Sequence, residues 1–155
     1  MSAKITMDAT DRQILRILRE EARIPIVDLA LRVGLSPTPC NRRLRKLEDS
    51  GLIAGYGARI DPAVAGFGIT AFVSVELERQ QSDELTRFQH KVAQFEEVVT
   101  GSLMTGTQDF LLEVAVESLE DFENFLQSRL LRLPGIRAVR SRFALRKFID
   151  RARLP

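Results

Sequence analysis

The sequence predicts an α+β protein with an N-terminal winged helix-turn-helix and a C-terminal ferredoxin-like βαββαβ sandwich. In residues 10–51, apolar side chains recur at helical spacing in three short runs. From residue 69 onward, alternating runs typical of half-buried strands are interleaved with two further helical runs. Between the halves, residues 61–66 contain Pro62 and Gly66, which favour a linker. We therefore expect one domain at 1–62, ending in a linker strand, and a second domain at 63–155.

The composition is that of a globular protein without a membrane-spanning segment. Of the 155 residues, 45% are hydrophobic, which is enough for a core in one domain or in two small ones. No apolar run approaches the roughly 18 residues that cross a bilayer, and the polar first residues lack the apolar segment of a signal peptide. The single cysteine excludes an intramolecular disulfide and fits a reducing compartment. We expect a cytoplasmic protein with no membrane partner.

Two helices are expected before residue 34. The first covers residues 10–22 and can be capped by Asp8 or Thr10, and the second covers residues 26–33. Their apolar side chains recur at helical spacing and are expected to face inward; they are Ile14, Leu15, Leu18 and Ala22 in the first helix and Leu29, Ala30 and Val33 in the second.

A third helix is expected between Ser36 and Gly51. Ser36 is a good N-cap, because its hydroxyl can accept from the free N–H groups of the first turn. Pro37 then takes the first helical position, where a missing N–H costs nothing. Leu44 and Leu47 give this helix its inner stripe. Only two residues separate its cap from the preceding helix, and this spacing predicts a helix-turn-helix.

The outer side of the third helix is basic. A short helix with a buried stripe and a basic face has the shape that enters a DNA major groove, although a solvated charged helix is the alternative. Asn41, Arg42 and Arg45 are spaced to present donors to base edges or phosphates. Arg43 and Lys46 are expected at the phosphate backbone. The candidate DNA-binding residues are Ser36, Pro37, Thr38, Asn41, Arg42, Arg43, Arg45 and Lys46.

The charge is unevenly distributed between the two halves. Residues 1–62 hold 11 Lys and Arg against 8 Asp and Glu, whereas residues 63–155 hold 12 against 13. Positive charge in the first half agrees with a domain that meets phosphates. After the third helix, Gly55 and Gly57 flank Tyr56 in a stretch that favours a strand or small wing able to contact the phosphate backbone.

The second half alternates strands with helices in the order βαββαβ. The helix after the first strand can be capped by Ser82 or Asp83, and Pro134 and Gly135 end the second. In a ferredoxin-like sheet the first strand lies between the third and the last. The expected elements are strands at 69–77, 98–104, 110–116 and 139–145, a turn at 105–108, and helices at 85–95 and 119–130.

One face of this sheet is expected to pair acidic strands with a basic one. Its charged residues are Glu76 and Glu78 on the first strand, Glu113 and Glu117 on the third, and Arg140, Arg142 and Arg146 on the last. Opposite charges on neighbouring strands favour cross-strand pairing. This face is either solvated, with exposed pairs of little value, or it forms a sheet-to-sheet dimer with Phe72, Leu111 and Ala144 as its apolar part. We expect the dimer, because two helix-turn-helix domains need a two-fold axis to read two half-sites.

Three stretches carry a resemblance that covers nearly the whole chain. They are VDLALRVGLSPTPCNRRLRKLEDSGLIAGYGARIDP, MTGTQDFLL and LLRLPGI. The first is similar to the DNA-binding domain of the Lrp/AsnC family, the leucine-responsive and asparagine-responsive regulators of bacteria and archaea, and the other two continue the match. The resemblance implies a homodimer, possibly an octamer, that binds double-stranded DNA and responds to a small amino-acid effector.

The turn at residues 106–109 is the candidate effector site. Its backbone N–H groups can receive a carboxylate and Asp109 an ammonium, although the residues alone favour a tight β-turn. The resemblance implies an effector site between subunits, lined by a loop that commonly reads Gly-Asp-Tyr/Phe-Asp. Gly106 and Asp109 match that loop, whereas Thr107 and Gln108 depart from it. Ser141 stands where the family often has threonine, and strand alternation places it on the same side as its apolar neighbours.

No catalytic or metal-binding pattern occurs in the sequence. The single histidine, His90, has no second histidine or cysteine nearby for a metal, and no phosphate-binding or nucleophile motif is present. We therefore expect no enzyme, no metal and no cofactor. The predicted function is a nucleoid-associated, sequence-specific transcriptional regulator controlled by an amino acid. The alternative is a ligand-independent architectural DNA-binding protein.

Overall fold

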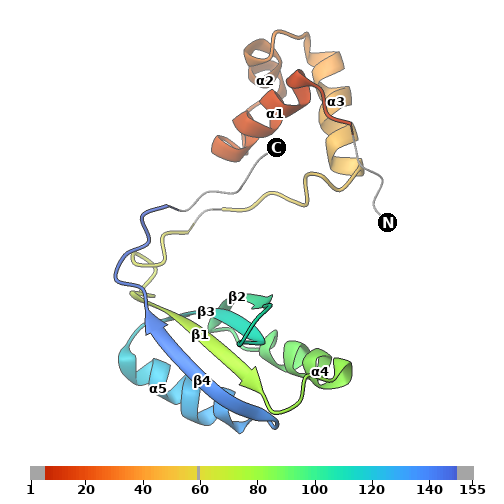
Figure 1. The fold of residues 1–155 in the computed structure, drawn as a ribbon. Coiled ribbons are helices and arrows are strands. Elements are labelled where there is room, and N and C mark those ends of the chain that lie inside the picture. Colours follow the sequence, from red (N-terminus) through yellow and green to blue (C-terminus); the bar gives the residue numbers. More distant parts are fainter. Residues whose placement is uncertain (1–5, 59, 150–155) are drawn as a thin grey trace. The chain divides into compact units, whose positions relative to one another are not determined.

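The computed structural model describes residues 6–58 and 60–149 (Figure 1). The chain divides into two compact units, the first extending to Arg59 and the second spanning Ile60–Phe148. The last residues of the expected second domain, 150–155, lie outside the described residues. Each unit has its own buried core, and the two are described in turn.

The first unit consists of three helices, as predicted. They are α1 (Ala9–Glu20), α2 (Ile26–Arg32) and α3 (Pro37–Asp49). Helix α1 ends two residues before the predicted position. Most of the side chains predicted to face inward are buried, Ile14 and Leu29 among them, and Cys40 and Leu47 of α3 complete the core. The prediction for Ala22 is wrong, because this residue lies beyond the end of α1 and is exposed, and Val33 and Leu44 are half-buried.

A capping box begins α1 and confirms Asp8 as its cap. The Asp8 carboxylate accepts from the Asp11 backbone N–H at 2.8 Å, and the Asp11 carboxylate accepts from the Asp8 N–H at 3.2 Å. Each side chain thus satisfies a donor that the helix itself leaves free. Asp11 is buried, so the box belongs to the core of the unit.

The turn between α2 and α3 is built on Gly34. Its φ of +69° lies in the left-handed region that glycine adopts without strain, and it ends α2. The next residue but one, Ser36, takes the N-cap position of α3 with an extended backbone, and Pro37 is the first helical residue, both as predicted. The prediction of a capping hydrogen bond is wrong, however, because the Ser36 side chain accepts no hydrogen bond from the first turn.

The stretch after α3 differs from the prediction. Residues 54–58 carry no strand, so the predicted wing strand is absent from this part of the described chain. Gly55 and Gly57 were its main signal, and no neighbouring strand lies in this unit to pair with the stretch. Tyr56 instead donates its hydroxyl to the Glu48 carboxylate of α3 at 2.7 Å. Burial, helped by this carboxylate, raises the pKa of Tyr56 to about 12.

The second unit is a four-stranded antiparallel sheet with two helices. Its order, β2-β3-β1-β4, confirms the ferredoxin-like prediction that the first strand lies between the third and the last. The final strand begins three residues earlier and ends two earlier than predicted. The elements are β1 (Ile69–Leu77), α4 (Ser82–Val92), β2 (Val98–Leu103), β3 (Phe110–Val116), α5 (Leu119–Ser128), the 3₁₀ turn Leu130–Arg132 and β4 (Ile136–Phe143).

The core of this unit lies between the sheet and the helices. Alternate residues of β3 are buried, as period-two patterns require. In β1 every residue from Val73 to Leu77 is buried, because Ser74 and Glu76 on the other face are covered as well. Phe88 of α4 stacks on Phe110 of β3 with ring centroids 4.6 Å apart, and Phe125 of α5 is almost fully buried. Figure 1 shows both helices behind the sheet, so its opposite face is left without helices.

Candidate functional site

The outer face of α3 gathers five of the eight predicted DNA-binding residues. Spaced three and four residues apart, they share one side of the helix and line a shallow concavity with Asp49 and Ser50. All five are exposed, whereas Cys40 and Leu47 on the opposite side are buried. We call this set the α3 outer face; its members are Thr38, Asn41, Arg42, Arg45 and Lys46.

The cations of the α3 outer face have no acidic partner. Arg42, Arg45 and Lys46 take part in no ion pair within the described parts of the chain. Asp49 is the acid that lines the same concavity. Three unpaired cations against one carboxylate leave the face positive, and it can receive phosphates or the acceptor groups of base edges.

At the N-terminus of α3, side-chain hydroxyls are available to a ligand, whereas few backbone N–H groups are. Pro37 and Pro39 have no N–H, so Thr38 carries the one backbone donor among the first three helical positions. The hydroxyls of Ser36 and Thr38 are exposed, and that of Ser36 is not used in capping. Anion binding at this end of the helix therefore depends on these two side chains.

Arg43, which was predicted to contact the phosphate backbone, does not line the concavity of the α3 outer face. Its Nη1 donates to Asp8 Oδ2 at 2.6 Å and to Asp11 Oδ1 at 2.9 Å. The Asp11 backbone N–H and the Arg43 guanidinium hold the pKa of Asp8 below its usual range, and the hydrogen bond to Asp8 raises the pKa of Arg43. Arg43 thus joins α3 to the capping box of α1.

The predicted effector loop is a tight turn whose aspartate already accepts a backbone hydrogen bond. Gly106 has a φ of +107°, and Thr107 is exposed beside it, while Gln108 is half-buried. Asp109 is 7% exposed, and its Oδ2 accepts the Leu77 backbone N–H at 2.7 Å. The carboxylate that was expected to receive an ammonium therefore holds the end of β1 with one of its oxygens.

Ser141 lies away from this loop within one protomer. It pairs with Val73 of β1, which is buried on the helix-covered side of the sheet, and this confirms the predicted alternation. Asp109 precedes β3, and β1 lies between β3 and β4. Two strand spacings are about 10 Å, so the protomer does not bring Ser141 and the Asp109 carboxylate together.

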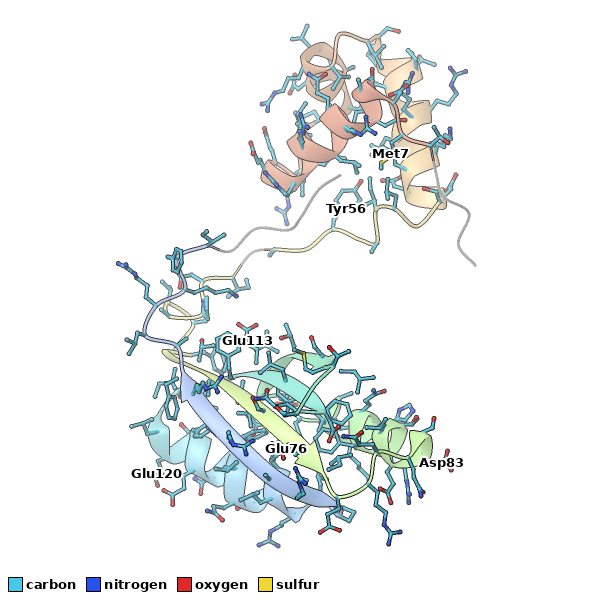
Figure 2. All side chains as sticks on the ribbon, in the orientation of Figure 1. Met7, Tyr56, Glu76, Asp83, Glu113 and Glu120 are labelled. Carbon is cyan, nitrogen blue, oxygen red and sulfur yellow. The ribbon has the colours of Figure 1, made fainter. Side chains whose placement is uncertain are left out.

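The helix-free face of the sheet carries the predicted cross-strand charge pair. Glu76 is 5% exposed, and Figure 2 labels it where β1 and β4 run side by side. It accepts from Arg137 Nη2 at 2.6 Å and from Arg140 Nη1. The hydrogen bond from Arg137 has the largest effect in lowering the pKa of Glu76, and the hydrogen bond from Arg140 lowers it further. Glu113 of β3 pairs instead with Lys147 at 3.3 Å.

Other chemistry has little support in the structure. No group of three or more His, Cys, Asp or Glu side chains that could hold a metal occurs among the described residues. Cys40 is buried, and this burial raises the pKa of its thiol, as in a packed core residue. Within the described part of the chain, no helix has the length and apolar character needed to cross a membrane.

Comparison with known proteins accounts for both units. The family model for the Lrp/AsnC ligand binding domain matches residues 70–154, and the model for a winged helix-turn-helix DNA-binding domain matches residues 7–54. The chain is 39% identical over 149 residues to the Bkd operon transcriptional regulator of Pseudomonas aeruginosa, with 96% of this chain and 97% of that protein covered. The chain belongs to the Lrp/AsnC family of transcriptional regulators.

Two further relatives extend the comparison within the Lrp/AsnC family. The leucine-responsive regulatory protein of Rhizobium meliloti is 36% identical over 150 residues, with 97% of this chain and 96% of that protein covered. A crystal structure of a transcriptional regulator from Neisseria meningitidis in complex with L-Met superimposes with a TM-score of 0.91 at 35% identity and covers 97% of each chain. The present chain is thus a DNA-binding transcriptional regulator of this family and not an enzyme.

The structural roles of two arginines of this Lrp/AsnC chain were not predicted from the sequence. Arg43 lies three residues after Cys40 and four before Leu47, so helical spacing alone places it toward the buried side of α3. Arg137 was missed because β4 was expected to begin only at residue 139. In both cases a cation lies beside a buried carboxylate, Asp11 or Glu76.

Proposed function

We propose that the chain regulates transcription by placing the α3 outer face in the major groove of operator DNA. The observation that carries this proposal is the row of unpaired, exposed cations, Arg42, Arg45 and Lys46, on one side of a helix whose other side is buried. Arg42 and Arg45 can donate to base edges, and Lys46 to phosphates. The hydroxyls of Ser36 and Thr38 and the amide of Asn41 add contacts at the start of the helix. Pro37 positions that start.

The proposal includes a homodimer formed through the helix-free face of the sheet. Phe72 is 37% exposed at the centre of this face, and Leu111 and Ala144 are half-buried beside it. A second copy would cover these apolar groups and would supply the second helix-turn-helix that a two-fold operator requires. Further association of dimers into an octamer is part of the same proposal.

An apolar amino acid is the effector that we propose. A relative from Neisseria meningitidis is known in complex with L-Met, and one from Rhizobium meliloti is named leucine-responsive. The loop containing Gly106, Thr107, Gln108 and Asp109 would supply backbone donors. Ser141 would come from another subunit, because within one protomer it lies two strands away. Binding between subunits can favour one assembly over another and so change the spacing of the DNA-binding units.

The cell compartment follows from these partners. A regulator that binds chromosomal DNA and senses free amino acids acts in the cytoplasm, associated with the nucleoid.

Fluorescence anisotropy with labelled duplexes tests the proposed function. The chain is titrated onto DNA from upstream of its own gene and onto a scrambled duplex, at two salt concentrations, with and without L-Met and L-Leu. We expect tighter binding to the upstream DNA and a shift of that binding by one of the amino acids. Binding that ignores both sequence and amino acids and collapses with salt would instead favour the architectural alternative. Absence of binding to either duplex would contradict the proposal.

A further inference from the structure

The second unit contains a hollow of about 340 Å³ beside α4. Its walls are α4, the end of β1 and the turn of residues 133–135 that leads into β4. Small-molecule sites commonly have volumes of roughly 300–1,000 Å³. No residue of the predicted effector loop at 106–109 lines this hollow, so it is a separate feature of the unit.

The floor of the hollow is apolar. Leu77 and Phe88 are 6% and 5% exposed, and Leu133 and Pro134 continue the apolar surface toward solvent. The ring of Phe88 is held by stacking on Phe110 of the core. An aliphatic group placed on this floor would be removed from water, which is favourable.

One edge of the hollow carries basic side chains. Arg87, His90 and Lys91 lie three and four residues apart on α4, and all three are exposed at its edge. None of them forms an ion pair within the described residues, although Arg87 Nε donates to the Asp83 backbone carbonyl at 3.2 Å. Glu84 is the acid that lines the hollow.

This edge differs from other arginine sites in the same unit. Arg129 donates to Glu97 at 2.9 Å and Arg137 to Glu76 at 2.6 Å, so those guanidinium groups already hold a carboxylate. At the hollow, Arg87 and Lys91 lie along one edge of an apolar floor and form no ion pair within the described residues. A ligand that carries both a carboxylate and an apolar group would therefore complement this hollow.

We propose that this hollow binds a small monocarboxylate with an aliphatic tail. The tail would lie on Leu77, Phe88 and Leu133, and the carboxylate would receive hydrogen bonds from Arg87 and Lys91. The cations outnumber the single carboxylate of Glu84, so an anion fits this edge better than an amine or a zwitterionic amino acid does. The site is additional to the amino-acid effector of the proposed function.

Octanoate is the probe, and His90 is the reporter. Because the chain has one histidine, its imidazole ring protons give a single set of resonances in a proton NMR spectrum. We expect octanoate to move these resonances in a saturable way. Octanamide and octylamine, which share the tail but lack the negative charge, should bind at least about tenfold more weakly, since charge-assisted hydrogen bonds are the stronger ones.

Two matched double variants locate the site. Arg87→Gln with Lys91→Gln should lower octanoate affinity at least tenfold, and Lys91→Arg should keep it within about threefold. The control, Arg12→Gln with Arg16→Gln on exposed positions of α1, makes the same change in net charge in the other unit and should leave affinity within about twofold.

Several outcomes would overturn the proposal. These are unmoved His90 resonances, equal binding of octylamine, equal loss of affinity in both double variants, and binding of L-leucine at His90 as tight as that of octanoate. The DNA-binding response to amino acids is read separately by anisotropy, so either proposal can fail while the other stands.

Discussion

Helix α3 and strand β4 both present rows of arginine, and their surroundings differ. On the α3 outer face, Arg42 and Arg45 have no acidic partner within the described residues. On β4, Arg137 and Arg140 hold the buried Glu76 between them. The comparison teaches that the number of basic residues does not identify a DNA-binding face. On α3 the unpaired cations also share one exposed side of a helix, where a phosphate that arrives would give each of them a new partner.

The sharpest test of this comparison removes the unpaired cations of α3. Arg42→Gln together with Arg45→Gln should lower the affinity for operator DNA by about 30-fold to about 20,000-fold, because each base-reading arginine contributes roughly 1–3 kcal/mol. Anisotropy with the upstream duplex measures the change. Arg129→Gln, an arginine of the second unit that already holds Glu97, is the control, and an equal loss there would remove the distinction between unpaired and paired arginines.

The junction between α1 and α3 should matter for stability. Asp11→Ala removes one partner of the capping box and one partner of Arg43, and we expect a loss of about 1–2 kcal/mol in the free energy of unfolding. Urea unfolding followed by circular dichroism measures it. Asp28→Ala, an exposed acid of α2, is the control and should stay within about 0.5 kcal/mol.

Acid should weaken the two paired clusters. The pKa values of Asp8 and Glu76 are lowered in the folded chain, so their contributions to stability are present above their unfolded pKa values and are lost as the pH falls through the folded ones. The urea midpoint should therefore drop between about pH 5 and pH 3. The drop should be smaller in a Glu76→Gln variant. A wild-type midpoint that is constant over this range would contradict the assigned pairs.

The smallest expected effect concerns Tyr56. It is the single tyrosine of the chain, so the ultraviolet absorbance of the phenolate reports it alone. Its pKa is raised to about 12, so its ionisation should be shifted upward in the folded chain relative to the chain in urea. Glu48→Gln should lower the folded value, because the Glu48 carboxylate disfavours the phenolate. An unchanged titration in that variant would argue against the 2.7 Å hydrogen bond.

Local patterns in the sequence were sufficient for most of the fold. Alternation along β1 and β3 and the helical stripe of α1 predict elements that the structure confirms. The prediction of a wing strand was wrong, because the glycines around Tyr56 allow the chain to bend but supply no second strand with which this stretch could pair. Asp8 was correctly predicted as a cap, whereas Ser36 occupies the N-cap position without making the capping bond.

The candidate site could be predicted only in part, because partners distant in sequence decide what a charged side chain does. The α3 outer face follows from spacing within one helix. The role of Arg43 is set by its ion pairs with Asp8 and Asp11, which lie more than 30 positions away in the sequence. The role of Asp109 is set by its hydrogen bond with the backbone N–H of Leu77, 32 positions away. Such pairings depend on how helices and strands pack, which no local pattern contains.

The salt dependence of DNA binding tests the central claim most directly. The slope of log affinity against log salt is compared for Arg42→Gln and Arg43→Gln, two neighbouring arginines with the same change in charge. We predict that Arg42→Gln reduces the slope by about one and that Arg43→Gln leaves it unchanged, because the aspartates already neutralise that guanidinium. The reverse result, with the slope reduced only in Arg43→Gln, would contradict the account.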